Sequence, residues 1–259
     1  MLLGVIWITI LVIPAKAKQE IDTTQYHLIA HRGGVVDATS PENSLQALEK
    51  AIAAGYWMVE VDLRVTADNV LIVNHDPTFN RYFGVDRKVS DMTWHEISRL
   101  TSNAGTKVLT FKELLQHCQG KIGVMIDNKI RGNDTLLFHK VIDLLKQYKL
   151  YDQALMIGTE ESTPFFTGKI KLSCTRKQLE ENMKKSNYNP AHYYLFSGNL
   201  SREDVLWAQQ HDILTIGVIN AWGMKTTDVM TKAREQAKKF IAAGVKNFQI
   251  DSIFAEFLE

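Results

Sequence analysis

Apolar and polar positions alternate along residues 59–64, where Val59, Val61 and Leu63 are interleaved with Glu60, Asp62 and Arg64. This period of two is typical of a β-strand. A turn at residues 66–69 and a second apolar run at residues 70–73 follow, so we expect a hairpin. With the turn centred between Ala67 and Asp68, Glu60 would lie opposite His75, and a bulge would shift this pairing by one residue.

Outside the hairpin, short apolar runs alternate with helical patterns along the rest of the chain. The expected strands lie near residues 28, 60, 124, 155, 171, 194, 216 and 249. Strands that alternate with helices indicate a parallel sheet, and eight such units favour a closed (β/α)8 TIM barrel. A doubly wound open sheet is the alternative, but no glycine-rich dinucleotide loop follows the first strand.

The segment before the hairpin predicts a helix that starts at Ser40 and ends at Gly55. Ser40 is the expected N-cap, with Pro41 and Glu42 in the first turn. Residues 77–109 have a mixed pattern and predict one short helix, over residues 93–100.

The N-terminal residues 1–17 predict a secretory signal peptide, because residues 2–13 are almost unbroken apolar and Ala15 and Ala17 form a small-x-small cleavage pattern. An uncleaved anchor is the alternative. Cleavage after Ala17 would leave residues 18–259 as a single barrel domain, periplasmic or secreted, with no stable membrane span.

Charge and cysteine content limit the partners. The chain has 30 basic and 29 acidic residues, a balance that argues against nucleic acid as a partner. Cys118 and Cys174 would form either a disulfide or two buried thiols. Nothing in the sequence indicates the oligomeric state.

Polar residues gather at the expected strand ends, where barrel enzymes place their active sites. Glu60, Asp62 and Asp127 offer three oxygen ligands to one Mg²⁺ or Ca²⁺. The cationic side chains Arg32 and Lys129 suit an anionic oxygen, and the imidazoles of His31 and His75 titrate near neutral pH. Cations around an anion, with two imidazoles, indicate cleavage of a phosphodiester.

Five segments together resemble the glycerophosphodiester phosphodiesterase family, within the phospholipase-C-like phosphodiesterases. They are residues 29–34 (Ile-Ala-His-Arg-Gly-Gly), 41–44 (Pro-Glu-Asn-Ser), 60–62 (Glu-Val-Asp), 71–78 (Leu-Ile-Val-Asn-His-Asp-Pro-Thr) and 127–129 (Asp-Asn-Lys). Weaker matches are residues 218–220 (Val-Ile-Asn) and Gly244-Val245 leading to Asp251.

The resemblance implies a distorted (β/α)8 barrel that hydrolyses glycerophosphodiesters to sn-glycerol 3-phosphate and an alcohol. It implies that His31 and His75 form the acid/base couple and that attack by a neighbouring substrate hydroxyl gives a cyclic phosphate, which water then opens. The same resemblance makes Glu60, Asp62 and Asp127 the metal ligands, and makes Arg32 and Lys129 the phosphate contacts.

The sequence departs from the family pattern at two positions. Asp127 stands where the family usually has Glu, one methylene longer, and Gly217 stands where an aromatic residue usually precedes the Val-x-Asn segment. Trp222 is a candidate substitute for that aromatic wall. We also expect supporting roles near the site for Glu42, which would orient Arg32 or a histidine, and for Asn220.

Two alternative functions remain open at this point. The same apparatus would serve a lysophospholipid or sphingolipid phosphodiesterase, which calls for an apolar surface loop. The candidate loops are residues 165–166 and residues 79–83. A non-enzymatic barrel that binds phosphorylated ligands is the other alternative, although no histidine or acidic residue of the set is missing.

Overall fold

A computed structural model describes residues 26–258 of the chain. The predicted signal segment, residues 1–17, lies outside this range, and so its cleavage and the export of the protein stay predictions.

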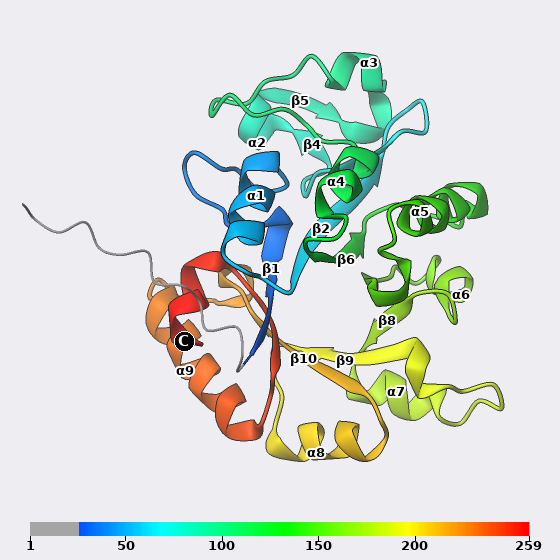
Figure 1. Ribbon diagram of the computed structural model, residues 1–259, viewed down its shortest axis with the longest axis vertical. Coiled ribbons are helices and arrows are strands. Elements are labelled where there is room, and N and C mark those ends of the chain that lie inside the picture. Colours follow the sequence, from blue (N-terminus) through cyan, green and yellow to red (C-terminus); the bar gives the residue numbers. More distant parts are fainter. Residues whose placement is uncertain (1–25, 259) are drawn as a thin grey trace, which may run out of the picture.

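Eight parallel strands form a closed barrel in which β1 pairs with both β2 and β11 (Figure 1). All eight expected strands are present, and the closure excludes the open-sheet alternative. The barrel strands are β1 (His27–Ala30), β2 (Met58–Val65), β6 (Gly123–Asn128), β7 (Leu155–Ile157), β8 (Lys171–Cys174), β9 (Tyr193–Ser197), β10 (Leu214–Ile219) and β11 (Asn247–Ile250).

Helices connect successive barrel strands and cover the outside of the barrel (Figure 1). They are α1 (Leu45–Ala53), α4 (Phe111–Cys118), α5 (Thr135–Gln147), α6 (Thr163–Phe166), α7 (Arg176–Asn182), α8 (Arg202–Gln210) and α9 (Val229–Ala243), with the shorter turns η1 (His31–Gly33), η3 (Tyr151–Gln153), η4 (Pro190–His192), η5 (Ala221–Gly223) and η6 (Ser252–Phe257). Within residues 26–258, each helix is too short or too polar to cross a lipid bilayer.

Successive residues of each barrel strand face alternately the barrel interior and the layer beneath the helices. On β2, Val59 and Val61 pack in the large core cluster under the helices, whereas Met58 packs with Met125 of β6 in a separate cluster. That separate cluster, which also contains Ile29, Leu155, Tyr194 and Ile216, fills the barrel interior. Glu60 and Asp62 share the side of β2 with Met58, and so they extend this interior face toward the C-terminal end.

The hairpin forms, but with a register one residue away from the primary prediction. Strand β3 (Leu71–Val73) pairs antiparallel to β2, with Leu63 opposite Val73. Glu60 therefore does not pair with His75. The physical cause is the turn, in which the N–H of Thr66 donates to the carbonyl of Val70 and Asn69 adopts a left-handed φ of 59°. The alternative shift by one residue is the observed one.

The first helix starts four residues later than predicted, with Ser44 rather than Ser40 as its N-cap. The Ser44 hydroxyl accepts a hydrogen bond from the N–H of Ala47. Asn43 has a positive φ of 54°, which is incompatible with a helix through this position. The segment before α1 instead carries Glu42 and Asn43 to the polar cluster described below.

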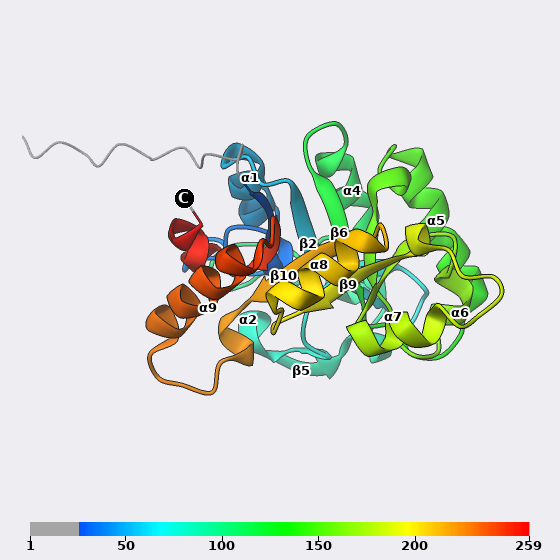
Figure 2. The same ribbon diagram turned by 90° about the horizontal axis from the view of Figure 1, so that it is seen from below.

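The mixed segment of residues 77–109 builds a small layer over one end of the barrel (Figure 2). It contains β4 (Thr78–Phe79), α2 (Asn80–Phe83), β5 (Val85–Lys88), η2 (Val89–Asp91) and α3 (Trp94–Ile97). Phe79, Val89 and Ile97 form its core together with Ile72 of the hairpin. Of these elements only α3 was predicted from the sequence, because the two-residue strand β4 and the four-residue β5 give too short an alternating pattern.

Cys118 and Cys174 are both free and buried, which settles the choice between a disulfide and two thiols. Burial raises the pKa of the Cys118 thiol to about 12 and that of Cys174 to about 11. Both side chains are therefore neutral packing groups.

Candidate active site

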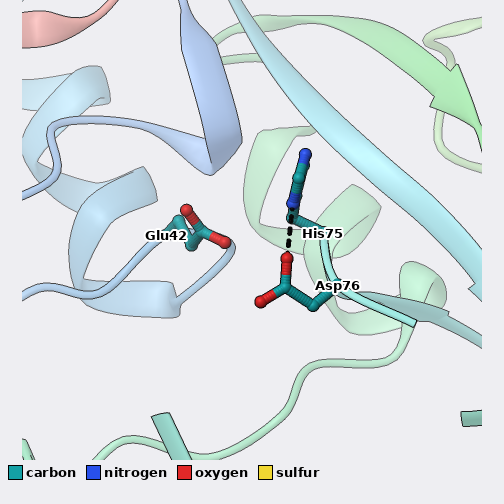
Figure 3. A group of neighbouring side chains, drawn as sticks. All are labelled: Glu42, His75 and Asp76. Carbon is teal, nitrogen blue, oxygen red and sulfur yellow. Dashed lines mark hydrogen bonds and ion pairs between the residues drawn. The ribbon is translucent and has the colours of Figure 1, made fainter. Parts of the chain in front are cut away.

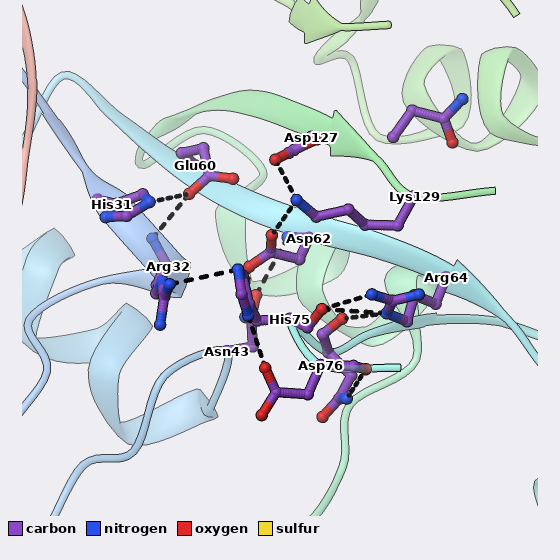
Figure 4. A network of polar contacts seen from close by, with 12 residues as sticks. His31, Arg32, Asn43, Glu60, Asp62, Arg64, His75, Asp76, Asp127 and Lys129 are labelled. Carbon is purple, nitrogen blue, oxygen red and sulfur yellow. Dashed lines mark hydrogen bonds and ion pairs between the residues drawn. The ribbon is translucent and has the colours of Figure 1, made fainter. Parts of the chain in front are cut away.

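Three carboxylates from two neighbouring strands meet at the C-terminal end of the barrel (Figure 4). Glu60 and Asp62 project from β2, and Asp127 projects from β6, where it is the register partner of Asp62. One oxygen from each of the three lies within 4.8 Å of the others. Oxygen ligands in this number suit a hard divalent cation such as Mg²⁺ or Ca²⁺.

Lys129 supplies the nearest positive charge to this cluster. Its Nζ lies 2.5 Å from Oδ2 of Asp127 and 3.4 Å from Oδ1 of Asp62. One ammonium group against three carboxylates leaves the cluster negative when all three are ionised.

Burial and mutual repulsion raise the pKa of two of these carboxyl groups. For Glu60, burial is the largest cause and the charges of Asp62 and Asp127 add to it. For Asp127, burial again raises the pKa, and Lys129 opposes it. A divalent cation would relieve this repulsion, and so the donor set of Glu60, Asp62 and Asp127 fits a bound metal.

His31, directly after β1, is oriented by an aspartate from the far end of the chain. Its Nδ1 lies 2.6 Å from Oδ1 of Asp251, which follows β11, and its Nε2 lies 3.9 Å from Glu60. Burial lowers the pKa of His31, but the hydrogen bond to Asp251 and the charge of Glu60 outweigh burial and raise it overall. His31 is therefore stabilised in its protonated form.

The loop after β1 turns sharply so that Arg32 faces the site. Arg32 has a φ of 55°, and its N–H donates to Oε2 of Glu60 at 2.7 Å. Gly33 follows with a φ of 85°, where a Cβ would lie 2.5 Å from the Cα of Asn43. Only glycine allows this approach of two backbone segments. Asn43 in turn donates from Nδ2 to Asp62 at 3.0 Å.

Glu42 orients two guanidinium groups, those of Arg32 and Arg81. Arg32 donates from Nη1 to Glu42 at 2.7 Å, and Arg81 lies within 3.0 Å of the same carboxylate. Arg81 also binds Asp76, with Nε 2.7 Å from Oδ2. Glu42, His75 and Asp76 form a second group of possible metal ligands (Figure 3), but the two guanidinium groups already supply its positive charge.

Three side chains, Asp76, Arg32 and Arg81, surround the ring nitrogens of His75. Its Nδ1 lies 2.8 Å from Oδ1 of Asp76, and its Nε2 lies 3.2 Å from Nη2 of Arg32. A carboxylate only accepts, so the short contact with Asp76 places the hydrogen on Nδ1, and Nε2 accepts from Arg32, while Nη2 of Arg81 lies farther from Nδ1, at 3.4 Å. Arg64 fixes the backbone here by donating to the carbonyl of His75 at 2.6 Å.

Trp222 forms one wall of a pocket of about 330 Å³ beside these groups, which we call the aromatic pocket. The guanidinium carbon of Arg32 lies 5.5 Å from the Trp222 ring centroid, and the His75 and Trp222 rings form a T-shaped pair with their centroids 6.2 Å apart. The pocket is lined by His31, Arg32, Val36, Glu42, Arg81, Tyr82, Ala221, Trp222, Asp251, Ser252 and Ile253.

Asn220 supports the loop that carries Trp222, and Gly217 faces away from the substrate side. The Asn220 side chain accepts from the N–H of Gly223 and so shapes the turn that carries Trp222. A Cβ on Gly217 would lie 2.9 Å from the ring of Phe240 on α9, so this position faces the helix layer. The expectation that Gly217 alters the pocket wall is therefore wrong, because the alternation of β10 directs this residue outward.

The two candidate loops for a lipid substrate differ, because residues 165–166 are packed against the core, whereas Tyr82 of residues 79–83 is partly exposed and lines the aromatic pocket. Phe79 and Phe166 are buried, and Phe165 packs against Phe138. The exposed apolar residues beside the aromatic pocket are Trp222, with 79% of its surface exposed, and Ile253, with 53%.

Several residues that support the site were not predicted from the sequence. Asp76 and Asp251 each bind the Nδ1 of a histidine, and Arg81 bridges Asp76 to Glu42. Asp76 directly follows His75 in the quoted segment, and Asp251 follows the last strand, so their positions in the sequence could have identified both as residues near the site. Arg81 carried none.

Fold and site together define a TIM-barrel protein with a buried acidic cluster and two carboxylate-bound imidazoles. A family model described as the Glycerophosphoryl diester phosphodiesterase family matches residues 31–216. The chain belongs to this family.

Comparisons with individual proteins agree with this assignment. The chain is 31% identical over 134 residues to lysophospholipase D GDPD1 of Rattus norvegicus, and 27% identical over 139 residues to a glycerophosphodiester phosphodiesterase of Caldanaerobacter subterraneus. These matches cover 47% and 50% of this chain, and 41% and 56% of the respective relatives. The chain thus spans about half the length of the curated relatives it matches.

Solved structures share the fold. A glycerophosphoryl diester phosphodiesterase from Parabacteroides distasonis superposes with a TM-score of 0.72 at 20% identity, over 92% of this chain and 87% of that one. An Oleispira antarctica phosphodiesterase in complex with the product sn-glycerol-3-phosphate gives 0.67 at 16% identity, over 93% and 99%.

Proposed function

We propose that this protein hydrolyses glycerophosphodiesters to sn-glycerol 3-phosphate and an alcohol, in a reaction that depends on one divalent cation. The observation that carries the proposal is the meeting of His31, His75, Arg32 and the three carboxylates at one end of the barrel. Membership of the family and the product bound in the Oleispira antarctica relative support it.

Arg32 is suited to bind the phosphodiester anion. Its Nε is buried and has no hydrogen-bond partner among the described residues, although Nη1 and Nη2 are engaged. A buried donor without a partner is costly, and a phosphoryl oxygen would satisfy it. Glu42 holds the guanidinium plane in place for this contact.

The two imidazoles divide the proton transfers. His75 presents an unprotonated Nε2 and accepts the proton of the attacking hydroxyl. His31, whose pKa is raised by Asp251 and Glu60 against the effect of burial, donates a proton to the oxygen of the departing alcohol. Glu60, Asp62 and Asp127 would hold the cation, which supplies charge stabilisation for the phosphoryl oxygens when bound.

Removal of divalent cations tests the proposal, with release of glycerol 3-phosphate from glycerophosphocholine as the readout. We expect exhaustive EDTA treatment to abolish the release, and Mg²⁺ or Ca²⁺ to restore it. Full activity after chelation would contradict the metal-dependent mechanism. An absence of release under all conditions, from a panel of glycerophosphodiesters, would contradict the function itself.

A lysophospholipid is a second candidate substrate, favoured by the exposed Trp222 and Ile253 at the edge of the aromatic pocket. Such apolar side chains suit an acyl chain. Release of choline from lysophosphatidylcholine, which would leave lysophosphatidic acid, compared with release of choline from glycerophosphocholine decides between the two candidates, since only the lipid phosphodiesterase would process the lysophospholipid efficiently.

A further inference from the structure

A second pocket next to the site, which we call the basic pocket, has a volume of about 570 Å³. Its cationic lining residues are Arg64, Lys88, Lys129 and Arg131. They come from the end of β2, from the end of β5 and from the segment after β6, so the pocket opens at the same end of the barrel as the catalytic groups. The lining contains one acidic residue, Asp134, whose Oδ1 already accepts the N–H groups of Leu136 and Leu137 as the N-cap of α5.

Three of the four cations have no carboxylate partner. Within residues 26–258, no acidic side chain lies within ion-pair distance of Arg64, Lys88 or Arg131. Arg64 donates through Nε and Nη2 to main-chain carbonyls only, those of Asn74 and His75. The charges of Asp62, Asp76 and Asp127 act on Arg64 from farther away, so Lys88 and Arg131 carry the free positive charge of the pocket, and cations on a concave surface attract an anion.

Lys129 connects the basic pocket to the catalytic centre. It lines the pocket, and its Nζ contacts both Asp127 and Asp62 (Figure 4). An anion in the pocket would therefore lie one side chain away from the proposed reacting phosphate. Arginine and lysine side chains in this arrangement suit a phosphoryl group, which accepts several charge-assisted hydrogen bonds.

We propose that the basic pocket binds a second phosphoryl group carried by the alcohol part of the substrate. The substrate class would then be diesters whose alcohol is itself phosphorylated. This inference rests on the proposed function for the identity of the reacting bond. The positive charge of the basic pocket does not depend on that function.

A pair of matched substrates tests the proposal: glycerophosphoglycerol, and the same compound with a phosphomonoester on its far hydroxyl. We expect a higher kcat/KM for the phosphorylated compound. Lys88→Gln/Arg131→Gln should remove this preference, on the order of two- to fivefold for each lost cation, because both side chains are exposed and ion pairs of exposed groups are weak. Turnover of the unphosphorylated compound should stay unchanged, because neither residue contacts the catalytic groups.

The control is Lys121→Gln/Lys184→Gln, which removes the same charge from two exposed lysines outside the pocket lining. It should retain the preference. Equal kcat/KM for both compounds in the wild type, or a preference that survives Lys88→Gln/Arg131→Gln, would overturn the proposal. Binding to anionic vesicles that requires Lys88 and Arg131, without any preference between the two compounds, would assign the cations to a lipid surface and overturn it as well.

A calorimetric titration separates this proposal from the proposed function. If neither compound is hydrolysed, the hydrolytic function fails, but the binding of both compounds remains measurable. Tighter binding of the phosphorylated compound, lost in Lys88→Gln/Arg131→Gln and kept in the control, would support the second phosphoryl site. Equal binding would overturn it.

Discussion

The aromatic pocket and the basic pocket flank the same catalytic centre, but their cations are paired differently. In the aromatic pocket, Arg32 and Arg81 are bound by Glu42, and Arg81 also by Asp76. In the basic pocket, Lys129 is paired with Asp127 and Asp62, but Lys88 and Arg131 have no carboxylate within ion-pair distance among the described residues. Carboxylates on the first side fix the direction of guanidinium donors, whereas the second side keeps its positive charge available for an external anion.

The largest expected effect comes from removing either imidazole of the catalytic centre that the two pockets flank. His31→Ala or His75→Ala should lower kcat for glycerol 3-phosphate release by about 10²–10⁴-fold, the usual contribution of one general acid or base. Thermal unfolding should still show a folded protein. His95→Ala, at an exposed position in α3, is the matched control and should be fully active. A fully active His31→Ala or His75→Ala would refute the assigned proton transfers.

An intermediate effect is expected when the carboxylate that binds the two guanidinium groups of the aromatic pocket loses its charge. Glu42→Gln removes the negative charge that Arg32 and Arg81 share, in a carboxylate that is only 7% exposed. We expect a loss of about 2 kcal/mol in the free energy of unfolding, because hydrogen bonds to charged groups contribute about 1.5–3 kcal/mol. Urea denaturation measures this change, and KM should rise because Arg32 loses its fixed direction.

Glu49→Gln provides the control for this substitution, since Glu49 is exposed on α1. Its unfolding free energy should change by less than about 0.5 kcal/mol. Equal stabilities of the two variants would show that the pairing with Glu42 contributes nothing, and the contrast between the pockets would lose its energetic basis.

The smallest expected effect is a shift of the pH profile. The hydrogen bond to Asp251 and the charge of that residue raise the pKa of His31 against the effect of burial, so His31 stays protonated to higher pH. Asp251→Asn removes the charge and should lower this pKa. Because the proposed role of His31 requires the proton, activity is lost as pH rises through its pKa, and the basic limb should move to lower pH.

Profiles of kcat against pH for the wild type and Asp251→Asn measure the shift. Asp212→Asn, at an exposed position, should leave the profile unchanged. A basic limb that stays in place in Asp251→Asn, or moves to higher pH, would show that His31 is not the proton donor.

Much of the barrel and its acidic cluster followed from local sequence patterns. The period of two on β2 placed Glu60 and Asp62 on one side, and parallel neighbours at equal height brought Asp127 beside Asp62. These relations need only strand identity and order. The hairpin register needed more, because it depends on one left-handed residue, Asn69.

Contacts that join distant segments were not predictable from patterns. The pairing of His31 with Asp251 spans 220 residues and exists only because the barrel closes between β1 and β11. Arg81 reaches the site from the small layer over the barrel, whose strands are too short to give an alternating pattern. The basic pocket likewise combines β2, β5 and the segment after β6, which no local pattern relates.

The most direct test of the central claim is a crystal structure with Mn²⁺ and glycerol 3-phosphate, with the metal located by its anomalous scattering. The account predicts one metal peak with oxygen ligands from Glu60, Asp62 and Asp127, and the phosphate between the imidazoles of His31 and His75. A metal held by other residues, or a phosphate bound away from both imidazoles, would contradict it.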